Sequence, residues 1–192
     1  MPNTFHILIA TAGRPSLRRM LDSLRGQLTA EDAITVVFDG AGARERAGFA
    51  PEWLEGHASA VSVIDQEPNL GFWGHGIRNE YQGRLSPATT YIMHADDDDV
   101  YTPGAFATLR QLCVDPTRLY FAKMNSNGHL IPSQNERIVQ DGIGTPCGIV
   151  PSSIAAEGHW VTAYGGDGAY YIGLASKYAF TILDAIIYLV RP

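Results

Sequence analysis

Lysine, cysteine and long apolar runs are scarce in this chain, and each scarcity excludes a class of protein. Lys123 and Lys177 are the lysines among 14 basic residues, and no glycine-rich loop ends in Gly-Lys-Ser or Gly-Lys-Thr, which excludes a Walker-type nucleotide site. A net charge of −6 without a basic block argues against a nucleic-acid partner. Cys113 and Cys147 fit no zinc or redox pattern, so we expect reduced thiols and a cytoplasmic location.

The apolar stretches are also too short for a membrane protein. The longest, at 182–190, contains an aspartate and cannot span a bilayer, so we expect no transmembrane segment. The amino terminus has no basic region of the kind that begins a signal peptide. The 192 residues, 45% hydrophobic, suit one globular domain over 1–192, and the sequence leaves open whether that domain belongs to a longer multidomain chain.

Strand and helix patterns alternate through the first half of the chain. Strands are predicted at 5–10, 34–38, 60–64 and 89–95, and helices at 16–28, 43–54, from 76 onward and at 103–112. This alternation predicts an α/β fold with a mainly parallel sheet flanked by helices. After residue 116 the pattern becomes irregular, with a strand predicted at 118–124, short strands within 130–150, and a final helix that begins near 169 or 176 and ends at 190.

The most informative motif is the run of four aspartates Asp96 to Asp99, which ends the apolar strand predicted at 89–95. Adjacent carboxylates repel one another, so the fold must hold them together for a reason, and a divalent cation is the simplest one. Side chains alternate along a strand, so Asp96 and Asp98 can face one way and Asp97 and Asp99 the other. Mg²⁺ and Mn²⁺ are commonly bound by one or two carboxylates together with substrate phosphates. The run therefore predicts a metal-bridged phosphate ligand, although a solvated acidic turn is the plainer interpretation.

Polar residues also follow the other predicted strands. The first strand ends in Thr11-Ala12-Gly13-Arg14, the second in Asp39-Gly40, and the third in Asp65, with Asn69 following it. Ligands of open α/β sheets bind outside the carboxyl ends of the strands, so these residues and the aspartates predict a single pocket. The glycines of 71–76 have the wrong spacing for a dinucleotide fingerprint, which disfavours a Rossmann dehydrogenase.

These motifs resemble the family 2-like glycosyltransferases of the GT-A fold, the nucleotide-diphospho-sugar transferases. The resemblance covers the chain to about residue 106 and is most specific at Tyr91 to Gly104, where the aspartate run looks like the Asp-x-Asp region of the family. It also includes Ile7 to Arg14, Val36 to Gly40, and Asn69-Leu70-Gly71 with Arg78-Asn79. The loop at 72–75 makes this last spacing longer than in many members. Residues 1–106 would then be the nucleotide-sugar half and 107–192 the acceptor half, the irregular acceptor side of the fold.

The resemblance also implies roles for individual residues. Thr11 and Asp39 would contact the base, Arg78 the base or the diphosphate, and Asp97 the ribose, while Asp98 would bind Mn²⁺ or Mg²⁺ with Asp96 beside it. The predicted nucleotide-binding set is Thr11, Ala12, Arg14, Asp39, Arg78, Asp96 and Asp97. The spacing alone leaves open which aspartate binds the metal, because a shift of one residue exchanges the two faces.

In the acceptor half, one carboxylate stands out in the segment from Tyr164 to Tyr171. Asp167 lies between glycines, which leave room for a substrate, and near aromatic residues, whose rings stack on sugars. By resemblance Asp167 would be the general base; by itself it is also a good helix-capping residue. The function predicted is a metal-dependent, inverting transfer of a sugar from a nucleoside diphosphate donor, with UDP-sugar favoured, to a saccharide or other hydroxyl acceptor.

Two other functions remain open at this level. Asp96-Asp97-Asp98-Asp99-Val100 also fits the nucleophile loop of haloacid dehalogenase-like phosphatases, with Asp96 as the nucleophile and Lys123 as the lysine suited to phosphate. That loop usually follows the first strand, whereas here it follows the fourth. The second alternative is a non-catalytic module that binds Ca²⁺ or carbohydrate, although the run lacks the glycine and terminal glutamate of an EF-hand loop.

Overall fold

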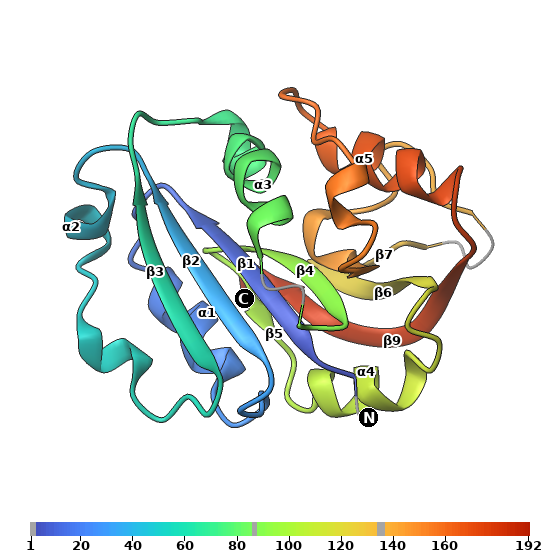
Figure 1. Ribbon diagram of the computed structural model, residues 1–192, viewed down its shortest axis with the longest axis horizontal. Coiled ribbons are helices and arrows are strands. Elements are labelled where there is room, and N and C mark those ends of the chain that lie inside the picture. The colour runs from blue at the N-terminus through green and yellow to red at the C-terminus, as the bar shows by residue number, and fades with distance from the viewer. Residues whose placement is uncertain (1–2, 86–87, 134–136) are drawn as a thin grey trace.

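The first half of the chain alternates strands and helices as the sequence predicts. The computed structural model describes residues 3–85, 88–133 and 137–192 (Figure 1). The elements of this half are β1 (Phe5–Thr11), α1 (Leu17–Leu24), β2 (Ala33–Asp39), α2 (Ala43–Ala47), β3 (Ala60–Gln66), α3 (His75–Tyr81), β4 (Tyr91–Asp96), β5 (Val100–Tyr101) and α4 (Ala105–Leu112).

The second half has fewer helices and a mixed set of strands. Its elements are β6 (Leu119–Ser126), β7 (His129–Ile131), β8 (Gly148–Pro151), α5 (Gly166–Ala175) and β9 (Phe180–Val190). Short 3-10 turns lie at Pro51–Leu54, Phe72–Gly74, Gln82–Arg84, Thr145–Cys147 and Ala155–Glu157. No helix of the described residues has the length and apolar character needed to cross a membrane.

One sheet runs through both halves of the described chain. Its strand order is β3-β2-β1-β4-β8-β6-β9-β5, with β7 paired to β6. The pairs among β1 to β4 are parallel, as is β6 with β9, whereas β8 joins β4 and β6 in antiparallel fashion. In the parallel part Thr11 lies opposite Phe38, and Ala10 lies opposite Asp96, so β1, β2 and β4 end at one edge. The fold is the α/β class that the sequence predicts.

The pleat of the sheet divides its apolar residues between two cores. On one face Phe5, Ile7 and Ile9 of β1 pack in a cluster with residues of α1, α2 and α4. On the other face Leu8 and Ala10 pack in a cluster with residues of α3 and α5. Helices thus cover both faces (Figure 1), which is why β1 is buried along its whole length.

The prediction of a helix ending at residue 190 is wrong for its second part. Residues Gly166–Ala175 form α5, but Phe180–Val190 is a strand that pairs with β6 on one side and β5 on the other. The run is rich in Ile, Leu and Val without strict alternation, a pattern that periodicity alone cannot assign to a helix or a strand. The helix predicted at 43–54 ends at Ala47, because Gly48 adopts φ 65° and Pro51 begins a separate 3-10 turn.

Candidate active site

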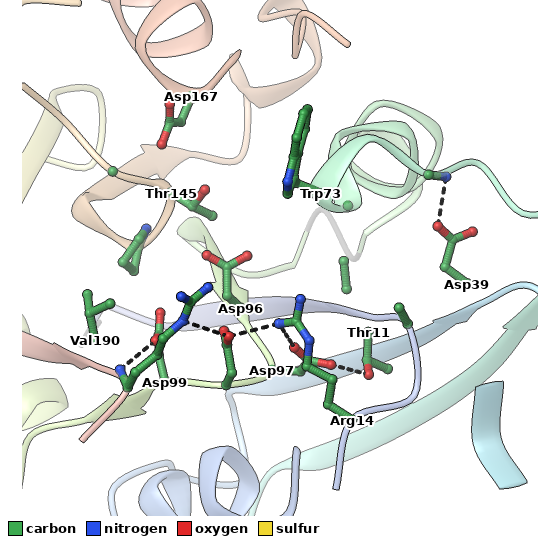
Figure 2. A pocket seen from close by; sticks show the side chains of 18 of the residues that line it. Thr11, Arg14, Asp39, Trp73, Asp96, Asp97, Asp99, Thr145, Asp167 and Val190 are labelled. Carbon is green, nitrogen blue, oxygen red and sulfur yellow. Dashed lines mark hydrogen bonds and ion pairs between the residues drawn. The ribbon is translucent and has the colours of Figure 1, made fainter. Parts of the chain in front are cut away.

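A pocket of about 390 Å³ opens at the edge where β1, β2 and β4 end. Figure 2 shows side chains from both halves of the chain around it. The lining residues are Ala10, Thr11, Ala12, Arg14, Asp39, Asn69, Gly71, Trp73, Gly74, Asp96, Asp97, Asp98, Asp99, Met124, Gly144, Thr145, Pro146, Asp167, Val190 and Arg191. Every predicted site residue except Arg78 is in this set, so residues far apart in the sequence meet at the predicted edge of the sheet.

The aspartate run turns away from the strand at its first residue. β4 ends at Asp96, and Asp97 and Asp98 form a turn before β5. Burial nevertheless alternates, since Asp97 and Asp99 are buried while Asp96 and Asp98 are partly exposed. The partly exposed pair Asp96 and Asp98 is therefore the one best placed to meet a ligand.

Arginine side chains neutralise much of the charge of the run. Arg14 Nη1 lies 2.9 Å from a carboxylate oxygen of Asp97 and 2.9 Å from one of Asp98, and Arg191 Nε lies 2.9 Å from the same Asp98 oxygen. The Arg14 and Arg191 side chains are 50% and 73% exposed. Both guanidinium groups are therefore open to solvent while they pair with Asp98.

The two buried aspartates are bound by neighbouring donors. The Thr11 hydroxyl donates to Asp97 at 2.5 Å; burial raises the pKa of Asp97, and the bonds from Thr11 and Arg14 oppose that shift. Burial raises the pKa of Asp99 to about 7, although the backbone N–H of Arg191 donates to its carboxylate at 2.9 Å. Thr11 and Asp97, predicted to contact base and ribose, are thus bonded to each other at the rim of the pocket.

Asp39 holds a loop as well as lining the pocket. Its two carboxylate oxygens accept hydrogen bonds from the backbone N–H groups of Leu70 at 2.7 Å and Gly71 at 2.8 Å. Gly40 follows at φ 94°, and Asn69 Nδ2 donates to the Asp39 carbonyl. Asp39 is only 5% exposed, so it fixes the wall of the pocket at the end of β2.

Arg78 lies beneath the pocket rather than in its lining. Its side chain is fully buried; Nη2 contacts Asp96 at 2.6 Å, and Nη1 donates to the Trp73 carbonyl at 2.8 Å. The guanidinium also lies over the Trp160 ring, 5.0 Å from its centre. The structure thus brings Arg78 to Asp96 and outside the pocket lining, and its contact with a base or diphosphate stays a prediction.

Asp167 stands on the opposite wall from the aspartate run. It is in the first turn of α5, and Figure 2 shows its carboxylate directed into the space above Asp96. Burial raises the pKa of Asp167, while a hydrogen bond from the N–H of Gly168 at 2.8 Å lowers it. A partly buried carboxylate with a raised pKa at the wall of a pocket is suited to accept a proton.

Arg191, Thr145 and Trp73 are among the lining residues that the sequence did not predict. Arg191 follows a segment predicted as helix, so nothing placed it at the edge of the sheet. Thr145 lies in a glycine-rich stretch without a pattern, and the Tyr171 hydroxyl donates to its carbonyl at 2.5 Å. Trp73 belongs to the loop at 72–75. The sequence indicates that this loop is longer than in many members of the family, but it does not indicate that the loop contributes to the pocket.

The carboxylate oxygens of Asp96 and Asp98 suit a hard cation only when a bound ligand supplies further oxygens. Among the residues that the structure describes, no three His, Cys, Asp or Glu side chains gather in a way that would hold a metal ion. Asp96 and Asp98 supply partly exposed carboxylates of the kind that Mg²⁺ and Mn²⁺ prefer. Such a site fits these ions if phosphate oxygens complete the coordination, and if Arg14 and Arg191 move away from Asp98.

Comparison with solved structures identifies the fold. The S. aureus TarS 1–349 structure aligns with a TM-score of 0.71 at 16% identity, over 97% of this chain and 60% of that one. TarS structures in complex with UDP-GlcNAc and with UDP align at TM-scores of 0.69 and 0.65. HddC from Yersinia pseudotuberculosis aligns at 0.56 and 13% identity, over 98% of this chain and 92% of that one.

These likenesses confirm the fold class, an α/β fold of GT-A type. The chain spans about three fifths of the length of the TarS 1–349 structure. It matches no protein-family model and no curated protein. At such low identities the comparison concerns the fold, and assignment to family 2 remains a prediction from the sequence.

Proposed function

We propose that this protein is a glycosyltransferase that uses a nucleotide-sugar donor, UDP-sugar by preference, and transfers the sugar with inversion to a hydroxyl acceptor. The observation that carries the proposal is the pocket itself. In it the residues predicted to bind the nucleotide sugar, at the ends of β1, β2 and β4, face the Asp167 carboxylate from the other half of the chain. The likeness to TarS, which binds UDP-GlcNAc and UDP in its structures, supports this choice of donor.

The donor end of the pocket suits a nucleoside diphosphate. Thr11 and Asp39 lie at the ends of neighbouring strands, where a base and ribose would find hydrogen-bonding groups. Arg14 and Arg191 supply positive charge next to the aspartates. Asp98, with Asp96 beside it, would hold Mn²⁺ or Mg²⁺, which would supply charge stabilisation to the departing phosphate. Arg14 and Arg191 lie next to these carboxylates and would contact phosphate oxygens.

The chemical step assigned to this chain is a proton transfer at Asp167. The acceptor hydroxyl loses its proton to the Asp167 carboxylate as its oxygen attacks the anomeric carbon, and the bond from that carbon to the diphosphate breaks. The electron pair leaves with the diphosphate oxygen. One displacement from the face opposite the leaving group inverts the anomeric configuration.

The structure does not favour the phosphatase alternative. Lys123, the lysine that would bind phosphate, forms an ion pair with Asp184 at 2.6 Å and does not line the pocket. Asp96, the nucleophile in that interpretation, is held by the buried Arg78. The aspartates follow β4, the fourth strand, rather than the first, as the sequence indicates.

The experiment is a thermal-shift and calorimetric titration with UDP and UDP-GlcNAc, in Mn²⁺ and in EDTA. A ligand at a hundredfold excess over its Kd stabilises the folded state by about 2.7 kcal/mol, which raises the Tm by roughly 5–10 °C. We expect this rise in Mn²⁺ and little of it in EDTA. Asp98→Ala should remove most of the metal dependence.

Asp22→Ala is the matched control, because Asp22 is an exposed carboxylate of α1 that pairs with the neighbouring Arg18 and Arg25 and does not line the pocket. Its ligand-induced shift should equal that of the parent protein. Equal UDP affinity in Mn²⁺ and EDTA would reject the metal dependence. Absence of any nucleotide binding in either condition would reject the donor class.

A further inference from the structure

The loop that leads into α3 is held in an unusual backbone conformation. Gly71, Phe72, Trp73 and Gly74 have φ of 65°, 55°, 54° and 82°, four positive values in succession. Phe72 and Trp73 carry large side chains, for which a positive φ is strained. Such strain persists only where the surroundings enforce it, and it concentrates at binding sites.

Two buried charged residues enforce the conformation of this loop. Asp39 binds the N–H of Leu70 and of Gly71 at its start, and Arg78 binds the carbonyl of Trp73 at its centre. Gly74 leaves no room for a side chain, since a Cβ there would lie 2.7 Å from the Cβ of Ala10. The loop is therefore held by residues of β1, β2 and α3.

The result is an exposed aromatic pair, of which Trp73 lines the pocket and Tyr164 contacts Trp73 from outside the lining. Trp73 lines the pocket yet is 65% exposed, and its ring lies 6.3 Å from that of Tyr164, edge to face. Tyr164 is 86% exposed and lies just before Asp167 in the chain. Behind Trp73, the rings of His75 and Trp160 continue the row into the core at 6.3 and 5.5 Å.

We infer that Trp73 and Tyr164 form the binding platform for the sugar ring of a saccharide acceptor, an inference that rests on the proposed function. Rigid exposed aromatic faces bind the C–H face of a pyranose by burying apolar surface at small entropic cost. Trp73 and Asp167 line the same pocket, so a sugar stacked on Trp73 can present a hydroxyl to that carboxylate. The acceptor is thus a saccharide rather than a small alcohol or a protein side chain.

The test measures binding of the protein, loaded with UDP and Mn²⁺, to a panel of immobilised oligosaccharides. We expect the parent to bind a subset of them, and Trp73→Ala and Tyr164→Ala to lose about tenfold or more in affinity, the loss for uncovering one aromatic face. Trp73→Phe should retain much of the binding. Phe72→Ala is the matched control, because Phe72 is an exposed aromatic of the same loop that does not line the pocket.

The outcomes separate this inference from the proposed function. UDP affinity is measured in parallel, and it should stay at the parent value in Trp73→Ala. If Trp73→Ala loses UDP affinity instead of saccharide affinity, the ring stacks on the base, and the acceptor platform is refuted while the transferase proposal stands. If the parent binds UDP but no saccharide, or if Phe72→Ala loses as much as Trp73→Ala, the platform is refuted as well. Failure to bind UDP at all contradicts the proposed function.

Discussion

Individual carboxylates of this site hold the surrounding structure in place and also line the pocket. Asp39 accepts two backbone hydrogen bonds, and Asp97 is bonded to Thr11 and Arg14. Each of these contacts joins residues distant in sequence. Removing such a side chain therefore changes the walls of the pocket as well as the groups that a ligand would meet.

Asp39→Ala is expected to lower the free energy of unfolding by about 1–3 kcal/mol, because two partly buried N–H groups lose their acceptor. Asp39→Asn, which keeps one acceptor oxygen, should lose about half as much. The measurement is urea unfolding at pH 7. Asp65→Ala is the control, since the exposed Asp65 at the end of the next strand pairs only with Arg44. A loss no larger for Asp39→Ala than for Asp65→Ala would contradict this reading of Asp39.

Asp167→Asn should lower the rate of sugar transfer by about two to four orders of magnitude and leave the Kd for UDP unchanged. The base must be ionised, so the parent's activity falls as pH drops through a pKa that burial raises above 3.8. Glu157→Gln is the control: Glu157 bonds to the Tyr178 hydroxyl and does not line the pocket. Unchanged turnover in Asp167→Asn would exclude it as the base.

The same variant has a consequence for stability. A carboxyl whose pKa is raised on folding binds its proton more tightly in the folded state, so its ionisation destabilises the fold as pH rises above 3.8. The amide of Asp167→Asn does not ionise. It should therefore be more stable than the parent at pH 7 and lose this advantage in acid, as urea unfolding at the two pH values would show. A variant that is less stable at pH 7 would indicate that Asp167 mainly caps α5.

At the scale of elements, α5 packs closely against β8 because Gly148 has no side chain. A Cβ on Gly148 of β8 would collide with the ring of Tyr171, which is fully buried in α5. Gly173 of the same helix has open space where its Cβ would be. These two glycines therefore make a matched pair, one required by packing and one not.

Gly148→Ala should destabilise the protein by about 2–3 kcal/mol through overpacking, whereas Gly173→Ala should stabilise it by about 0.5–1 kcal/mol through its helix propensity. Thermal or urea unfolding of both variants measures the difference. Opposite signs are the expected result. Equal effects at the two positions would mean that α5 and β8 are not packed closely.

The sequence predicts some elements better than others for physical reasons. α1 is predictable because Leu17, Met20, Leu21 and Leu24 repeat at helical spacing and are all buried on one side. β9 is not, because it lies between two strands and lacks the alternation that marks a half-covered strand. The positions of the predicted site residues follow from strand ends, but their partners depend on contacts such as Arg78 with Asp96, which local patterns do not contain.

At the scale of the whole molecule, the two halves share one sheet and both apolar clusters. β4 and β8 pair at Tyr91 with Pro151 and at Ile92 with Val150, and each core contains residues from both halves. The pocket lies across this junction. The prediction of a single domain implies that the halves do not unfold separately.

Urea unfolding should therefore give one transition for both halves. Trp53 reports on the first half and the fully buried Trp160 on the second, so in a Trp73→Phe background the further changes Trp160→Phe and Trp53→Phe isolate one signal each. Their fluorescence midpoints, each compared with far-UV circular dichroism of the same variant, should coincide. Each fluorescence midpoint is compared with the circular dichroism of its own variant. If the midpoints for Trp53 and Trp160 then differ clearly, the protein contains two cooperative units.

The contacts of the buried Arg78 guanidinium restrict which residues position 78 can hold. It serves the Asp96 carboxylate, the Trp73 carbonyl and the Trp160 face at once. A lysine carries a point charge rather than a planar fork and cannot meet all three. In a library of random variants selected for activity, position 78 should keep arginine alone. Position 14, whose arginine is half exposed, should accept lysine.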